Sequence, residues 1–130
     1  MSFEAKLVAL LDAASLSCGD RIFPILLPEG EALPAVSYMM IRPSEARGRS
    51  RDGGQPDLER LRIQVNVWGQ TFEQARSLAE QIRAILEGHK DDTPVERIAW
   101  SFIANVDDEY EEGANLFIRR LDCIAWYVRS

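Results

Sequence analysis

The residues best suited to chemistry in this sequence are five carboxylates near the C-terminus. They fill all but one of the positions from 107 to 112: Asp107, Asp108, Glu109, Glu111 and Glu112. Divalent cations bind several oxygens at once, so a small metal-dependent enzyme is one interpretation of this run. The run lacks the D-x-[DN]-x-[DN]-G spacing that wraps oxygens around one ion. We favour a solvated acidic turn, keep an acidic contact surface for a partner as an alternative, and predict no metal site.

The one histidine, His89, follows Gly88 in a polar stretch. Catalytic triads and histidine metal sites need partner side chains, so we interpret this single residue as solvated at a helix end, interacting with the helix dipole. The signatures G-x-x-x-x-G-K-[ST], G-x-G-x-x-G, G-x-S-x-G and H-E-x-x-H are absent. The sequence therefore predicts no catalytic residue, no cofactor and no small-molecule substrate.

A basic segment contrasts with the acidic balance of the chain. Its arginines are Arg42, Arg47, Arg49 and Arg51, and Glu45 is the one acid among them. The 130-residue chain has a net charge of -6 and a pI of about 4.8, which argues against non-specific nucleic-acid binding by the whole surface. Arginines without interleaved aromatics are a weak signal for nucleic acid. A solvated loop and a functional contact both stay open, with a protein contact favoured over a DNA contact.

Two amphipathic helices are predicted to support these segments. The first covers residues 2–14, with apolar side chains at helical spacing and Ser2 available as the N-cap. The second begins at Thr71, whose hydroxyl can accept the N–H of Gln74 while the Gln74 side chain reaches back. Its apolar stripe is Phe72, Ala75, Leu78, Ala79, Ile82, Ile85 and Leu86. Gly88 stands where a left-handed C-terminal cap is expected.

Four strands are predicted between and after these helices. They are Val36–Ile41, Leu61–Trp68, Ile98–Val106 and Leu116–Val128. Residues 21–24 form either a short edge strand or an extended loop, because proline punctuates them. The order helix, hairpin, helix, hairpin predicts an α+β two-layer sandwich, with a mostly antiparallel four-stranded sheet and two main helices packed on one face. A single domain is expected to cover residues 1–130.

Apolar residues occur on both faces of two of these strands. They are Met39 and Ile41 on the first strand, and Ile124, Trp126 and Val128 on the last. A strand of an antiparallel sheet needs only one buried face, so either helices cover both faces or the second face contacts another subunit. Because only two helices are predicted, we favour oligomerisation.

The cysteines and the N-terminus indicate in which cellular compartment the protein is expected. Cys18 and Cys123 are far apart and form neither C-x-x-C nor half of a zinc framework, so we expect small core residues in a reduced, cytosolic compartment. The N-terminus lacks the features of a signal peptide, and no apolar run approaches the roughly 20 residues that span a bilayer. We expect a cytoplasmic protein without a membrane anchor.

Several segments, taken in order, resemble a known family. They are Phe3–Leu11 (FEAKLVALL), Gly19–Pro24 (GDRIFP), Ala32–Tyr38 (ALPAVSY), Ile63–Gly69 (IQVNVWG), Thr71–Ala75 (TFEQA), Asp107–Tyr110 (DDEY) and Arg119–Tyr127 (RRLDCIAWY). Over nearly its whole length the sequence resembles the small tail-completion, or tail-to-head joining, proteins of long-tailed phages and prophages. Each segment is a packing or turn pattern, and their order along one short chain is what makes the resemblance specific.

The resemblance implies a structural protein without enzymatic activity, cofactor or catalytic residues. It implies a ring of identical subunits, expected to be a hexamer, between the tail tube and the head connector, with DNA passing through the lumen. The partners would be other copies of the chain, the head connector or stopper protein and the tail-tube protein. The protein would reside at the head–tail junction of the virion after assembly in the bacterial cytoplasm. A tail terminator ring, which caps growth of the tube, is the alternative within the same class.

The resemblance also gives the charged segments a role. A cyclic ring joins one patch of a subunit to a different patch on its neighbour. The basic segment with Arg47, Arg49 and Arg51 and the acidic run from Asp107 to Glu112 would suit the two halves of such an interface, or a docking surface for the adjoining ring. A DNA-binding accessory protein that uses the arginines is a further alternative, and it would bind with a steep salt dependence.

Overall fold

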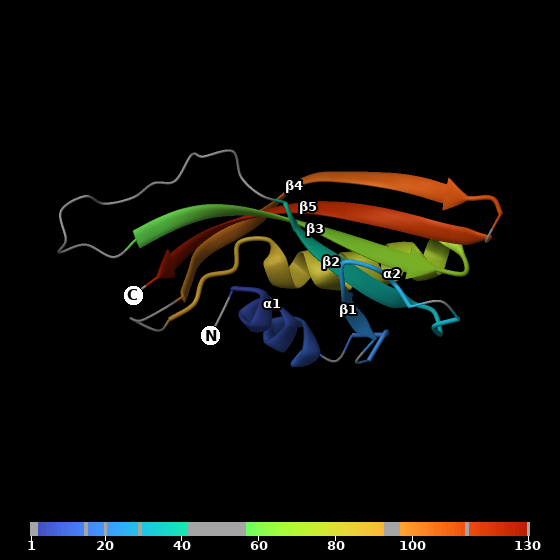
Figure 1. Ribbon diagram of the computed structural model, residues 1–130, viewed down its shortest axis with the longest axis horizontal. Helices are drawn as coiled ribbons and strands as arrows, with labels where there is room; N and C mark the ends of the chain where they lie inside the picture. Colours follow the sequence, from blue (N-terminus) through green and yellow to red (C-terminus); the bar gives the residue numbers. More distant parts are fainter. Residues whose placement is uncertain are drawn as a thin grey trace.

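The computed structural model describes residues 3–14, 16–19, 21–28, 30–41, 57–92, 97–113 and 115–129 (Figure 1). It is an α+β fold with one five-stranded sheet in the order β1-β2-β3-β5-β4. The strands are β1 (Ile22–Pro24), β2 (Ala35–Ile41), β3 (Asp57–Gly69), β4 (Arg97–Glu111) and β5 (Leu116–Arg129). All neighbours pair antiparallel except β1 and β2. The predicted fold class is confirmed.

The predicted count of four strands is too low by one. The sequence allowed either a strand or a loop at residues 21–24, and the structure has a short parallel edge strand there, β1. Pro24 ends this strand at the outside of the sheet, where a missing N–H costs no ladder hydrogen bond. Parallel pairing with β2 requires the chain to cross back from Ile25 to Pro34, so neither residue spacing nor alternation reveals it.

Both helices pack on one face of the sheet, as predicted. Helix α1 (Phe3–Asp12) buries Phe3, Leu7 and Leu11, and the Phe3 ring meets Tyr127 of β5 edge to face at 5.5 Å. Helix α2 (Phe72–Leu86) buries the stripe that its spacing predicts, apart from exposed Phe72 and half-buried Ile85. No helix of the described residues is both long and apolar enough to cross a membrane. Ser2, the predicted N-cap, lies outside the described residues.

The predicted caps of α2 are present. The Gln74 N–H donates to Thr71 Oγ1 at 3.1 Å, and the Gln74 side chain accepts the Gln70 N–H at 2.7 Å. Past the helix, Gly88 has the left-handed φ of 74° that its place in the sequence predicts. At the start of α2, a Cβ on Gly69 would lie 2.7 Å from the Ala75 nitrogen, so only glycine lets β3 turn this tightly into the helix. These contacts hold α2 on the sheet.

The alternation predicted for β3 defines the core. Leu61, Ile63, Val65 and Val67 are all buried under the helices, and they pair across the sheet with β5 residues of the same face. Burial of this contiguous apolar face is the main favourable term for folding. The helix-covered side of the sheet is therefore complete within one chain.

The acidic run is not a turn, which corrects the sequence interpretation. Strand β4 continues through Asp107, Asp108, Glu109 and Glu111, and only Glu112 lies in the turn before β5. The register places Asp107 opposite Arg120 and Asp108 opposite Arg119, so opposite charges face each other across the strands. This pairing lets the strand extend beyond Val106, where the apolar alternation ends.

Candidate assembly surfaces

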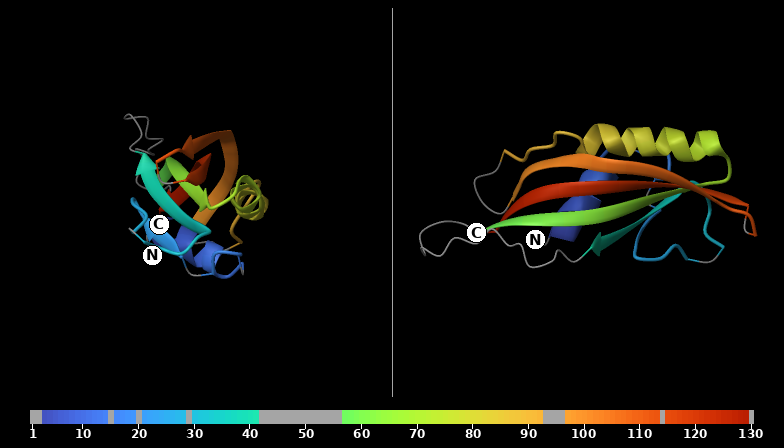
Figure 2. Two further views of the ribbon diagram at one scale, coloured as in Figure 1. Left: turned by 90° about the vertical axis from the view of Figure 1, so that its right-hand side faces the viewer. Right: turned by 90° about the horizontal axis from the view of Figure 1, so that it is seen from above.

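The face of the sheet opposite the helices is the first candidate surface. No helix of the described residues covers it, as Figures 1 and 2 show. Its side chains alternate with those of the core, and they include apolar residues toward both ends of the sheet and polar residues in the middle. We call this side the uncovered face, and its members from the two central strands are Arg60, Arg62, Gln64, Asn66 and Trp68 of β3 and Ile118, Arg120, Asp122, Ile124 and Trp126 of β5.

The apolar residues singled out in the sequence come together on this face. Ile41 pairs with Arg62, and Arg62 pairs with Ile124, so β2 and β5 place their isoleucines on either side of one arginine. Met39, 37% exposed, lies on the same face of β2. Ile124 is only 8% exposed and Trp126 is half-buried, so the sheet itself shields much of this group.

Two aromatic residues of β4 extend this apolar group and were missed in the sequence. Trp100 pairs with Trp126, and Phe102 pairs with Ile124. The Trp100 and Phe102 rings lie 5.2 Å apart, and Trp100 is 48% exposed. The i, i+2 spacing of the two rings was a usable signal. A register shift between Ile98 and Trp100 moves them to the face opposite Ile98, which regular alternation would not allow.

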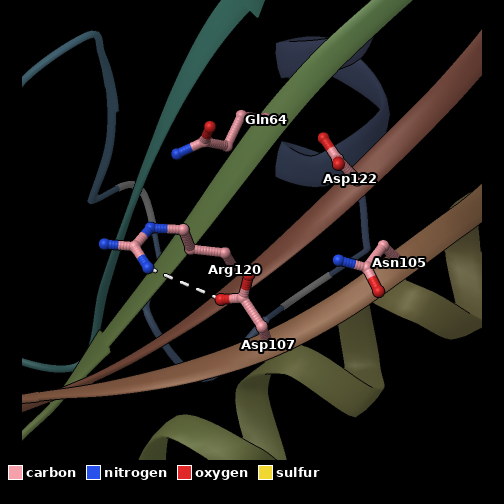
Figure 3. A pocket seen from close by; sticks show the side chains of 5 residues that line it. All are labelled: Gln64, Asn105, Asp107, Arg120 and Asp122. Carbon is pink, nitrogen blue, oxygen red and sulfur yellow. Dashed lines mark hydrogen bonds and ion pairs between the residues drawn. The ribbon is translucent and has the colours of Figure 1, made fainter.

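The middle of the uncovered face is a small polar hollow (Figure 3). It is lined by Gln64, Asn105, Asp107, Arg120 and Asp122 and has a volume of about 40 Å³. Ligand pockets usually measure about 300–1,000 Å³, so this hollow suits ordered water rather than a substrate. Its charged groups already have partners, because Arg62 donates twice to Asp122 at 2.7 and 3.3 Å and Arg120 lies 3.5 Å from Asp107.

The acids of β4 are mostly neutralised within the chain. Arg119 donates to both carboxylate oxygens of Asp108, at 2.7 and 3.0 Å, and these hydrogen bonds hold the pKa of Asp108 below its ordinary value. Arg120 pairs with Asp107 and Glu109. Among the described residues, no hydrogen bond or ion pair engages the Glu111 or Glu112 side chain. The unpaired negative charge is therefore confined to the turn end of the hairpin.

The basic segment connects β2 to β3. Arg42, Arg47, Arg49 and Arg51 lie outside the described residues. The described residues that flank them are Ile41, which pairs with Arg62, and Asp57, which pairs with Arg129 near the C-terminal end of β5. The turn between β4 and β5 marks the other end of the long axis (Figure 1). The described residues that flank the basic segment thus lie beside the middle of β3 and at its first residue, whereas Glu111 and Glu112 lie at the other end of the sheet.

His89 is not a solvated residue, which corrects the sequence interpretation. Its side chain is only 19% exposed, and Nε2 lies 2.8 Å from Asp91 Oδ1. Asp91 Oδ2 accepts the Ile98 N–H at 2.8 Å and lies 3.7 Å from Lys6 Nζ. Burial acts to raise the pKa of Asp91, but the Ile98 N–H, His89 and Lys6 outweigh it, so the pKa is lowered. These contacts fasten the segment after α2 to β4.

The described residues offer no other obvious chemistry. They contain no group of three or more histidine, cysteine, aspartate or glutamate side chains placed to hold a metal ion. Cys18 and Cys123 are buried thiols, as their expected place in the core requires. Burial raises the pKa of Cys123 to about 12, so this thiol carries almost no thiolate at neutral pH.

Comparison with known proteins complements this geometry. A sequence profile described as tail completion protein gp17 matches residues 5–128. None of the curated proteins compared with the chain matches it. Among solved structures, a chain from the virion of a native gene transfer agent particle superposes with a TM-score of 0.58 and 17% identity, over 95% of this chain and 85% of that one. At this identity the likeness concerns the fold.

Proposed function

The chain belongs to the tail completion protein gp17 family, and we propose that it completes a phage or prophage tail as one subunit of a ring that joins the tail tube to the head connector. The observation that carries the proposal is the extent of the family match, which leaves only residues 1–4 and 129–130 outside it. The role is structural, and the proposal includes no enzymatic activity. The protein would sit at the head–tail junction of the virion after assembling in the host cytoplasm.

The uncovered face supports an assembling subunit. Met39, Ile41, Ile124, Trp126 and the newly placed Trp100 give one sheet face an apolar end that the chain itself leaves without a helix. A surface of this kind is typical of proteins that bury it against a partner. We assign it to contact with other copies of the chain or with the adjoining rings of connector and tube.

The charge distribution supports a contact between unlike patches. Arg42, Arg47, Arg49 and Arg51 belong to the segment between β2 and β3, whereas Glu111 and Glu112 lie at the β4–β5 turn. In this proposal the two segments attract each other between neighbouring subunits or stacked rings. Asp107, Asp108 and Glu109 contribute differently, because their arginine partners in the same chain keep the hairpin extended.

The partners in this proposal are proteins. They are further copies of the chain in a hexameric ring, the head connector or stopper protein, and the tail-tube protein. DNA passes through the lumen without specific binding, and neither a membrane nor a small molecule takes part. Binding of DNA to the isolated protein with a steep salt dependence would instead favour the accessory DNA-binding alternative.

Removal of the protein from an otherwise complete particle tests the proposed role. If the chain joins tails to heads, particles without it should yield filled heads and separate tails of normal length, visible by electron microscopy. Supplying the wild-type chain should restore joined particles. Overlong tails would instead identify the tail terminator, and unaltered particles would contradict both.

A melting experiment tests the metal-dependent enzyme alternative. A cation that binds only the native state raises the melting temperature as its concentration increases. We expect equal melting temperatures with millimolar Mg²⁺ or Ca²⁺ and with a chelator. A marked rise with either cation would contradict the assignment of the acidic strand to a purely structural role.

A further inference from the structure

The outer edge of β4 is closed over its first half only (Figure 1). The segment after α2 runs beside the strand there, since Gly88 N–H donates to the Ser101 carbonyl at 2.8 Å and Ser101 N–H donates to the His89 carbonyl at 3.1 Å. From Asn105 to Glu111, the main chain of β4 pairs with β5 alone in the part of the chain that the structure describes. We call this half the open edge. Unpaired N–H and C=O groups on a strand edge are a template to which a further strand can add.

Three carboxylates lie in one row along the open edge. Successive side chains of a strand point to opposite faces, so Asp107, Glu109 and Glu111 share a face. It is the uncovered face, because Asp107 pairs with Arg120 (Figure 3). Arg120 forms ion pairs with Asp107 and Glu109, and no hydrogen bond or ion pair of the described residues engages the exposed Glu111 side chain. The three negative charges therefore share a single arginine within the described part of the chain.

The basic segment repeats this spacing with the opposite charge. Arg47, Arg49 and Arg51 alternate with one glycine and one serine, so in an extended strand the three arginines would share one face. No proline occurs from 44 to 55, so every residue of this stretch has the N–H that a sheet ladder requires. A strand made by residues 47–51 on the open edge would set three arginines opposite three carboxylates. Opposite charges that face each other across strands stabilise the pairing.

The two rows cannot meet within one chain. Asp57, where β3 begins, pairs with Arg129 of β5, whereas Asp107 pairs with Arg120, nine positions earlier in the same strand. At about 3.4 Å per residue, the levels of Asp57 and Asp107 are about 30 Å apart along the sheet. The six residues from Arg51 to Asp57 span at most about 22 Å. In either strand direction Arg51 would have to lie beside Asp107 or farther still, so the added strand must come from another copy.

We propose that residues 47–51 of a neighbouring copy add as a strand to the open edge of β4. The inference rests on the proposed ring and names the contact that joins its subunits. Main-chain hydrogen bonds supply the affinity of an added strand, and the two charge rows set its register. A second copy is the occupant that fits, because the rows match in spacing and number, are opposite in sign and cannot meet within one chain. The donor segment and the acceptor edge are different patches, as the heterologous contact of a ring requires.

Hydrogen exchange of the wild-type protein tests the strand addition. In dilute monomer, the amide hydrogens of the open edge that point away from β5 should exchange freely. In the assembled protein they should exchange at least about tenfold more slowly, because the added strand accepts their hydrogen bonds. Residues 117–122 of β5 are the internal control, since β3 and β4 already pair with them on both sides. Equally fast exchange of residues 105–111 in both states, measured by mass spectrometry of peptic fragments, would overturn the inference.

A charge exchange tests the pairing of the two rows. Glu111→Lys reverses a charge without a partner among the described residues, so the monomer should keep its melting temperature. Association should weaken at least about tenfold, measured by light scattering over a range of concentrations. Adding Arg51→Glu should restore association if the two strands run parallel, and adding Arg47→Glu should restore it if they run antiparallel.

The matched control for the charge exchange is Glu112→Lys. It makes the same change in charge at an exposed position in the turn past the open edge, so this variant should assemble like wild type. Rescue of Glu111→Lys by neither arginine substitution would overturn the pairing of the rows. Tighter association of Glu111→Lys than of wild type would also overturn it, because the acids would then serve to keep the edge unpaired.

The outcomes separate this inference from the proposed function. A wild-type multimer whose open edge exchanges freely would overturn the strand addition and leave the ring intact. A wild-type chain that stays monomeric up to millimolar concentration would contradict the self-assembling ring and the inference together. If Glu111→Lys failed to fold, hydrogen exchange of the wild-type protein would still decide between the two.

Discussion

The two faces of the sheet differ in burial: one lies under the two helices and the other is left partly exposed. On the covered face, β3 and β5 contribute residues such as Ile63 and Leu121 that are almost fully buried under the two helices. On the uncovered face, a polar network around Arg62 and Asp122 separates apolar residues that remain in part exposed, among them Met39 and Trp100. The first face supplies the stability of one subunit. The second face leaves part of its apolar surface exposed, which is the arrangement expected of an assembling protein.

The largest expected effect is a difference between the two faces in how far a truncated side chain lowers the free energy of unfolding. Leu121→Ala removes a side chain that is 1% exposed on the covered face, and it should lower the free energy of unfolding by about 3 kcal/mol. Trp100→Ala on the uncovered face should cost the monomer less than about 1 kcal/mol, although it removes a larger side chain. Urea denaturation of dilute protein measures both. Equal losses would show that the uncovered face belongs to the folding core.

The junction that holds α2 on the covered face gives the next effect. Gly69→Ala would place a Cβ 2.7 Å from the main-chain nitrogen of Ala75, which cannot move without shifting the helix. We expect a loss of about 2 kcal/mol in the free energy of unfolding. Gly113→Ala, in the β4–β5 turn where an added Cβ meets nothing within 4 Å, is the matched control. If the two variants melted alike, the close approach of β3 and α2 would not limit stability.

A pH dependence tests the contact that closes the first half of β4. The folded-state pKa of Asp91 is lowered, so its ionised form adds stability at pH values above the ordinary aspartate pKa of about 3.9, and that contribution is lost as the pH falls through the folded value. Asp91→Asn should cost about 1 kcal/mol at pH 7, and the difference from wild type should shrink below about pH 4. Asp92→Asn, at the neighbouring exposed position, is the control. A difference independent of pH would mean that shape, not charge, matters at Asp91.

The smallest effect has the opposite sign. Ile25→Gly removes the conformational penalty of a positive φ at a β-branched residue, so the monomer should gain up to about 1 kcal/mol after the entropic cost of glycine. Thermal melting of dilute protein measures the effect. A lowered melting temperature would show that the Ile25 side chain makes contacts that the fold needs.

Local patterns predicted the elements whose partners are close in sequence. The alternation from Leu61 to Val67 predicts β3, and the Thr71 and Gln74 pair predicts the start of α2. Gly88 likewise has the backbone conformation that its place after the helix implies. Short-range hydrogen bonds and periodic burial determine these features, so one segment of sequence contains the information.

Long-range pairing determined what the sequence did not reveal. Strand β4 continues past Val106 only because Arg119 and Arg120 of β5 neutralise its acids, and a charge run by itself favours a turn. A register shift, not alternation, moves Trp100 onto the face that holds Trp126. The candidate apolar residues were recognised by type, but their gathering around Arg62 follows from the order of strands in the sheet.

The mass of the wild-type protein in solution tests the central claim most directly. Light scattering over a wide range of concentrations should show a multiple of the 14.7 kDa chain that reaches a plateau, as a closed ring requires. The account predicts a hexamer at that plateau. A mass of 14.7 kDa at every concentration would contradict the claim that copies of this chain assemble into a ring.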